Sequence, residues 1–121
     1  TTLIDVAALA ALERPVIVDC RFDLRDTARG EAAYAEGHIP GAVYAHLDRD
    51  LSSEPTTDYG RHPLPPPARI SEVFGRLGID QAAQVVCYDD ANGMMAARLW
   101  WMLRYMGHDA VAVLDGGYQA W

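Results

Sequence analysis

Near the middle of the chain, an apolar strand-like run leads through a short loop into a long apolar helix. The strand is expected at residues 84–88, the loop at 89–93 and the helix at 94–106. In open α/β folds, ligands bind where strands end and helices begin, because backbone N–H groups and the helix dipole converge there. A nucleophile is therefore expected in this loop. The loop instead begins with Asp89, and the nearby Cys87 lies inside the strand.

Strand-like and helix-like segments alternate along the whole chain. Strands are expected at residues 16–18, 42–44, 84–88 and 111–114, and helices at residues 6–12, 31–36, 70–77 and 94–106. Thr2 and Asp5 have the spacing of a capping box for the first helix. Strands that alternate with helices predict one α/β domain, with a parallel sheet covered by helices on both faces.

The composition argues against several classes of protein. With 121 residues, of which 50% are hydrophobic, the chain fits one compact domain. Its net charge of −7 argues against binding to nucleic acid. No apolar run approaches the ~20 residues of a membrane span, and the first residues lack the pattern of a signal peptide. Two cysteines in apolar strand contexts favour a reducing compartment, and we expect a cytoplasmic protein.

Three separated motifs coincide in this chain. They are Val-Asp-Cys-Arg at residues 18–21, Tyr-Ala-Glu-Gly-His-Ile-Pro-Gly-Ala at 34–42 and Val-Leu-Asp-Gly-Gly-Tyr-Gln-Ala-Trp at 113–121. Together they resemble a rhodanese domain over essentially the whole chain. Two further features make the resemblance more specific: Arg-His-Pro-Leu-Pro at 61–65 and the Trp pair at 100–101. With them, the chain resembles the non-catalytic N-terminal half of bacterial tandem thiosulfate/3-mercaptopyruvate sulfurtransferases.

The resemblance implies a domain organisation. We expect residues 1–121 to form a single rhodanese-like domain. The chain stops at the apolar Trp121, just where another helix begins. We therefore interpret it as a piece of a two-domain protein.

The resemblance also implies a persulfide chemistry that needs no cofactor. In catalytic rhodanese domains a cysteine opens the active loop, and its thiolate carries sulfur from a donor to an acceptor. Aligned on residues 85–89, the place of that cysteine falls on Asp89. The rest of the active loop corresponds to Asp90, Ala91, Asn92, Gly93 and Met94. A carboxylate cannot hold a sulfur–sulfur bond, so this domain alone is expected to be inactive.

The irregular segment at residues 48–67 holds a second set of candidates. It contains five prolines, and a loop of this length in a compact domain is usually functional or part of an interface. The resemblance to mercaptopyruvate-type enzymes implies that His62, oriented by Asp48, assists proton transfer in the other half. Arg61 is expected to help bind an anionic sulfur donor. A solvated loop histidine is the alternative for His62.

Other polar and sulfur-containing residues are expected to be structural. Cys87 and Cys20 lie in apolar strands, where cysteines behave as small hydrophobic residues. Asp89 and Asp90 lack a histidine or third acid nearby, so they are expected to cap the loop rather than bind a metal. His38 is expected to bond to neighbouring loops. No special signal attaches to the remaining histidines, His46 and His108.

Two functions remain open from the sequence. The first is the N-terminal domain of a thiosulfate or 3-mercaptopyruvate sulfurtransferase. This domain would pack against a second rhodanese domain of the same chain and support its reaction with a small anionic sulfur donor. The second is a stand-alone, catalytically silent rhodanese-like module that binds a partner protein. Nucleotide binding is disfavoured, since the Gly-x-Gly-x-x-Gly and Gly-x4-Gly-Lys patterns are both absent.

Overall fold

The computed structural model describes residues 3–53 and 62–121, and these form one layered α/β unit. The strands are β1 (Leu3–Ile4), β2 (Val16–Asp19), β3 (Val43–Tyr44), β4 (Val85–Tyr88) and β5 (Val111–Leu114). The helices are α1 (Val6–Ala11), α2 (Arg29–Glu36), α3 (Pro67–Arg76), α4 (Ala96–Tyr105) and α5 (Gly117–Ala120). None of these helices is long and apolar enough to cross a membrane.

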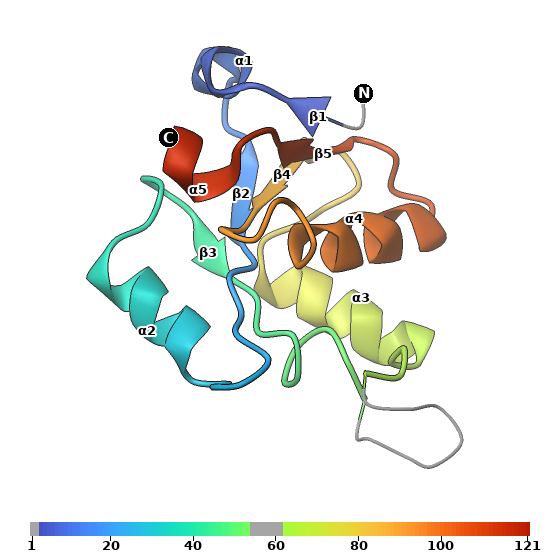
Figure 1. The fold of residues 1–121 in the computed structure, drawn as a ribbon. Helices are drawn as coiled ribbons and strands as arrows, with labels where there is room; N and C mark the ends of the chain where they lie inside the picture. Colours follow the sequence, from blue (N-terminus) through green and yellow to red (C-terminus); the bar gives the residue numbers. More distant parts are fainter. Residues whose placement is uncertain (1–2, 54–61) are drawn as a thin grey trace.

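The five strands form a single sheet in the order β1-β5-β4-β2-β3, and every neighbouring pair is parallel (Figure 1). The predicted parallel α/β sheet is therefore confirmed. Its register places Val18 of β2 opposite Cys87 of β4, and Cys87 opposite Val113 of β5. The three central strands thus run side by side through the middle of the molecule.

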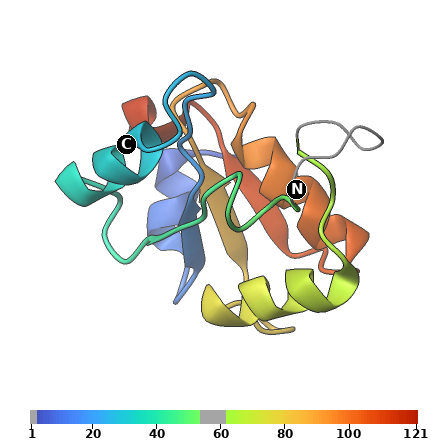
Figure 2. The same cartoon turned by 90° about the horizontal axis from the view of Figure 1, so that it is seen from below.

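Two apolar layers cover the sheet, one on each face. In β4, Val85 and Cys87 pack into the core cluster formed with α3 and α4, whereas Val86 and Tyr88 pack with residues of α1, α2 and α5. This division follows from strand geometry, because successive side chains point to opposite faces. In Figure 2 the sheet lies between the blue and cyan helices on one side and the yellow and orange helices on the other.

The first helix begins at the expected residue, Val6, but its cap differs from the capping box expected at Thr2 and Asp5. Thr2 lies outside the described residues, and β1 pairs with β5 at the edge of the sheet. Asp5 is instead the N-cap of α1, and its Oδ1 accepts a hydrogen bond from the N–H of Ala8 at 2.7 Å. Because residues 3–4 pair with β5, the chain enters the helix at Asp5, whose side chain then satisfies a first-turn N–H group.

Both cysteines lie in the core. Cys87 has no exposed surface, and Cys20, directly after β2, is 2% exposed. Burial raises the pKa of the Cys87 thiol from 9.0 to about 12. It also raises the pKa of Cys20 well above the ordinary value. Neither thiol therefore supplies a thiolate at neutral pH, which is the form that reacts with sulfur compounds.

We predict that Cys87→Ala lowers the free energy of unfolding by about 1–2 kcal/mol, because it leaves a small cavity among closely packed neighbours. Urea unfolding followed by circular dichroism measures this change. In the Cys20→Ala background, Cys87 is the remaining thiol and should react slowly with a thiol reagent until the protein is unfolded. Rapid labelling of the native protein at neutral pH would contradict its place in the core.

Candidate functional site

The parallel strands bring polar residues to one edge of the sheet. Asp89 follows β4, Arg21 lies just beyond β2, and residues 45–51 follow β3. Because all the strands run in the same direction, their carboxyl ends share this edge. The loop at residues 89–95 leads from this edge into α4. The expected active loop therefore lies where an open α/β sheet offers a binding site.

The carboxylate of Asp89 is enclosed by the loop that it begins. Its Oδ1 accepts hydrogen bonds from the N–H groups of Ala91 and Gly93, both at 2.9 Å. Its Oδ2 accepts from the N–H groups of Met95 at 2.8 Å and Ala96 at 2.7 Å. Asp89 is only 1% exposed. Four backbone donors thus converge on one carboxylate at the start of α4, where the helix dipole also favours negative charge.

The backbone conformation of the loop explains this convergence. Asn92 and Gly93 both have positive φ angles, 58° and 86°. Glycine adopts this region freely and asparagine tolerates it, so the chain can fold back toward Asp89. The flanking Asp90 is exposed, and so is Met94, at 69%. Asn92 is exposed as well, so the amide groups of the loop face Asp89 while three of its residues meet solvent.

His62 and Asp48 lie in contact at the same edge. The Nε2 atom of His62 and Oδ1 of Asp48 are 2.9 Å apart. The two side chains are 23% and 43% exposed, so the pair is accessible from outside the domain. The structure thus brings together the two residues that the sequence named as assisting groups. A carboxylate bonded to one ring nitrogen holds a histidine in one orientation.

Arg98 of α4 holds the two chain segments that carry this pair. Its guanidinium donates to the carbonyl oxygen of Leu51 at 2.8 Å and to those of His62 and Pro63 at 3.1 and 3.3 Å. Burial lowers the pKa of Arg98 from its ordinary value. A guanidinium has five donors in a rigid fork, which suits it to bind several carbonyl oxygens at once. Arg98 therefore ties residues 51 and 62–63 to the helix that begins at the Asp89 loop.

A buried ion pair lies beside the loop. Arg21 donates to the Asp19 carboxylate at 2.7 Å and to the carbonyl oxygen of Gly37 at 2.6 Å. The hydroxyl of Tyr88 donates to the same carboxylate at 2.9 Å. Arg21 also lines a cavity of about 500 Å³ together with Leu24, Arg25, Arg29, Asp90 and Met95. Because Asp19 offsets its charge, Arg21 contributes little free positive potential to this cavity.

Residues 3–121 match the Rhodanese-like domain family. The chain belongs to this family. A Pseudomonas aeruginosa protein named as a probable 3-mercaptopyruvate sulfurtransferase is 47% identical over 116 residues, which are 93% of this chain and 41% of that protein. The rhodanese fold and the family resemblance inferred from the three motifs are thereby confirmed.

Solved structures agree with this assignment. The 3-mercaptopyruvate sulfurtransferase from Leishmania major has a TM-score of 0.91 at 38% identity, covering 98% of this chain and 33% of that chain. SseA from Escherichia coli, a 3-mercaptopyruvate sulfurtransferase, has a TM-score of 0.83 at 33% identity, covering 100% of this chain and 47% of that chain. This rhodanese-like domain thus spans less than half of each of these relatives.

The structure shows where most of the expected site residues lie, and their roles stay predictions. Arg61 lies outside the described residues. Asp89 caps its loop through four hydrogen bonds. His38 bonds to the carbonyl oxygen of Tyr34 at 2.8 Å. Within residues 3–53 and 62–121, the structure holds no group of three side chains arranged to bind a metal. The catalytic assistance by His62 and Asp48 stays a prediction.

Two features of this rhodanese-like domain were not predicted from the sequence. One is the buried cluster of Asp19, Arg21 and Tyr88. The sequence signal for it was an aspartate at the end of an apolar strand, because a charge at such a position needs a buried partner. The other is His46, whose ring nitrogens bond to three backbone groups. Nothing in the local sequence around His46 indicated these contacts.

We predict that Asp89→Ala lowers the free energy of unfolding by about 2–4 kcal/mol, because it leaves four buried or partly buried N–H groups without their acceptor. Urea unfolding measures the loss. The matched control is Asp90→Ala, which removes a neighbouring exposed carboxylate and should change stability by less than ~0.5 kcal/mol. Equal stability of the two variants would show that the Asp89 hydrogen bonds do not hold the loop.

Proposed function

We propose that this chain is the N-terminal domain of a two-domain sulfurtransferase that uses 3-mercaptopyruvate or thiosulfate. In this proposal the domain forms no persulfide of its own and supports the active site of a second rhodanese domain in the same chain. The observation that carries the proposal is the Asp89 carboxylate, which fills the amide cradle where the family resemblance places the reactive cysteine. A carboxylate there leaves the loop without a sulfur nucleophile.

The burial of both thiols supports the absence of a persulfide. Cys87 packs between the sheet and α4 rather than in the loop, and Cys20 is buried on the same side. Their raised pKa values keep them protonated at neutral pH. The same two unpaired cysteines support a reducing, cytoplasmic location.

The second rhodanese domain is expected to cover the edge that carries the Asp89 loop. Leu24 and Met94 are apolar residues that this edge exposes, at 47% and 69%. The accessible His62–Asp48 pair lies at the same edge, so a domain docked there would meet both the apolar residues and the histidine. Burying such side chains against another domain is favourable in proportion to the apolar area removed from water.

In this arrangement His62 supplies a proton to the reaction in the second domain. A cysteine thiolate there would attack the sulfur of 3-mercaptopyruvate, breaking its carbon–sulfur bond and leaving a pyruvate enolate that must take up a proton. Asp48 bonds to Nε2, and within the part of the chain that the structure describes Nδ1 has no hydrogen-bond partner, so Nδ1 is the nitrogen that would exchange a proton with the substrate. With thiosulfate, the sulfur–sulfur bond breaks and the leaving sulfite needs little protonation. The contribution of His62 should therefore depend on the donor.

A stand-alone binding module is the competing function. It predicts that the residues following position 121 in the natural protein do not encode a second rhodanese domain with a cysteine-led loop. Reading that sequence separates the two functions directly.

We predict that the 121-residue chain by itself does not transfer sulfur from thiosulfate to cyanide, since it offers no exposed thiolate. Thiocyanate formation measures the activity. Turnover well above the buffer control that disappears in Cys87→Ser would contradict this prediction and assign the reaction to the buried thiol.

We predict that His62→Ala in the two-domain protein lowers turnover of 3-mercaptopyruvate by about 10²-fold or more, the usual contribution of general acid–base catalysis. Turnover of thiosulfate should fall much less. The matched control is His108→Ala, which removes a half-buried histidine bonded to the carbonyl oxygen of Ala83. If His62→Ala retains wild-type rates with both donors, His62 is a solvated loop residue and the proposed assistance is wrong.

A further inference from the structure

The segment after β3 forms a closed turn that presents Asp48 to solvent. Leu47 is 8% exposed and Leu51 is 1% exposed, so buried leucines lie on both sides of the exposed Asp48 in the chain. Within the turn, the N–H of Asp50 donates to the carbonyl oxygen of His46 at 2.8 Å, and the N–H of His46 donates to Oδ2 of Asp50 at 2.8 Å. These two hydrogen bonds therefore join the two ends of the turn.

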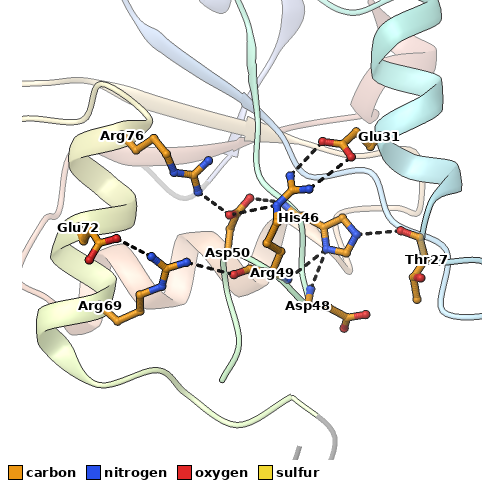
Figure 3. A network of polar contacts seen from close by, with 9 residues as sticks. All are labelled: Thr27, Glu31, His46, Asp48, Arg49, Asp50, Arg69, Glu72 and Arg76. Carbon is orange, nitrogen blue, oxygen red and sulfur yellow. Dashed lines mark hydrogen bonds and ion pairs between the residues drawn. The ribbon is translucent and has the colours of Figure 1, made fainter. Parts of the chain in front are cut away.

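The ring of His46 bonds to three backbone groups. Its Nδ1 accepts hydrogen bonds from the N–H groups of Asp48 and Arg49, both at 3.2 Å (Figure 3). Its Nε2 lies 2.8 Å from the carbonyl oxygen of Thr27. Two donors at Nδ1 require a lone pair there, so the hydrogen is on Nε2 and is donated to Thr27. One neutral tautomer satisfies all three contacts.

The same ring links the turn to the residues around His62. His46 makes an edge contact with Phe22, with ring centroids 5.2 Å apart. Phe22 makes a second edge contact with His62 at 6.5 Å. The two histidines therefore pack on one buried aromatic ring, which is 6% exposed. Edge-on contacts between rings favour particular relative orientations.

Ion pairs hold the turn between two helices. Asp50, which is 1% exposed, bonds to Arg76 of α3, and Arg49 bonds to Glu31 of α2 at 2.9 Å. Figure 3 shows these groups on either side of the turn, with the His46 ring between Thr27 and the backbone of residues 48–49. These contacts fix the position of the turn. Among residues 3–53 and 62–121, the hydrogen bond to the backbone of Asp48 itself comes from His46.

We propose that His46 is a positioning residue for the His62–Asp48 pair. Its Nδ1 holds the N–H of Asp48, its Nε2–H ties the turn to Thr27, and its ring packs on the phenylalanine that also supports His62. The Asp48 carboxylate is thereby presented to His62 at hydrogen-bonding distance. The inference rests on the proposed function of that pair in sulfur transfer. A misplacement on the order of 1 Å at such a pair can lower a rate by about 10²-fold.

The substitutions that test this role separate the hydrogen bonds from the packing. His46→Phe keeps an aromatic ring against Phe22 but lacks the nitrogen that accepts from Asp48. His46→Asn supplies a side-chain oxygen that can accept from backbone N–H groups two and three residues later, as in an Asx turn. The matched control is His108→Phe, because His108 is also half-buried and its Nε2 also bonds to a carbonyl oxygen, that of Ala83.

The experiment measures turnover of 3-mercaptopyruvate in the two-domain protein. Asp48→Asn and His46→Phe should each lower turnover by about 10- to 100-fold. The double variant should be no more than about 2-fold slower than the slower single variant, because both substitutions act through the same carboxylate. His46→Asn should stay within about 3-fold of wild type and His108→Phe should match wild type. Hydrogen exchange in the peptide of residues 45–53 should be faster in His46→Phe than in either the wild-type protein or His46→Asn.

Three outcomes overturn the positioning role. If His46→Phe keeps wild-type turnover while Asp48→Asn is impaired, His46 does not position Asp48. If the two losses multiply in the double variant, His46 acts through stability or another route. If Asp48→Asn and His62→Ala both keep wild-type turnover, the proposed function of the pair is wrong and the positioning role is wrong with it. Should His46→Phe fail to fold, His46→Leu replaces it, since leucine also lacks the ring nitrogens.

Discussion

The hydrogen bonds from four backbone N–H groups to the Asp89 carboxylate determine the architecture of the sheet edge that carries the candidate site. They join the end of β4 to the first turn of α4, so the direction in which α4 leaves the sheet depends on them. Arg98 on that helix then binds the carbonyl oxygens of Leu51 and His62. The position of the segment that carries His62 therefore depends, through α4, on the loop that Asp89 organises.

Under the proposed function, the Asp89 loop also explains how a rhodanese-like domain keeps its fold with a carboxylate in place of the reactive cysteine. A cradle of amide groups at a helix N-terminus stabilises any anion of suitable size, whether a thiolate, a persulfide or a carboxylate. The carboxylate meets the structural need of the loop because it accepts two hydrogen bonds at each oxygen. A carboxylate cannot form a persulfide, because it has no sulfur. The structural and chemical roles of this position are thus separable.

The His62–Asp48 pair depends on contacts from several parts of the chain. Asp48 belongs to a turn held by His46 and Asp50, whereas His62 is held from the backbone side by Arg98 and packs near Phe22. Both side chains remain partly exposed although their backbones are anchored. An anchored backbone with an accessible side chain is the arrangement expected of a group that acts on a substrate bound by another domain.

The sequence by itself determined the parallel sheet, the two helical layers and the burial of Cys87, because these follow from local apolar periodicity and from the alternation of side chains along a strand. The motifs also located the Asp89 loop and named Asp48 and His62. Only the tertiary structure decided that Asp89 would receive four amide hydrogen bonds, that a short edge strand would precede the first helix, and that His46 would bond to Thr27 and to the turn at residues 48–49. These contacts join groups whose orientation depends on loop conformation and on packing between distant elements, and no local pattern of residues specifies either one.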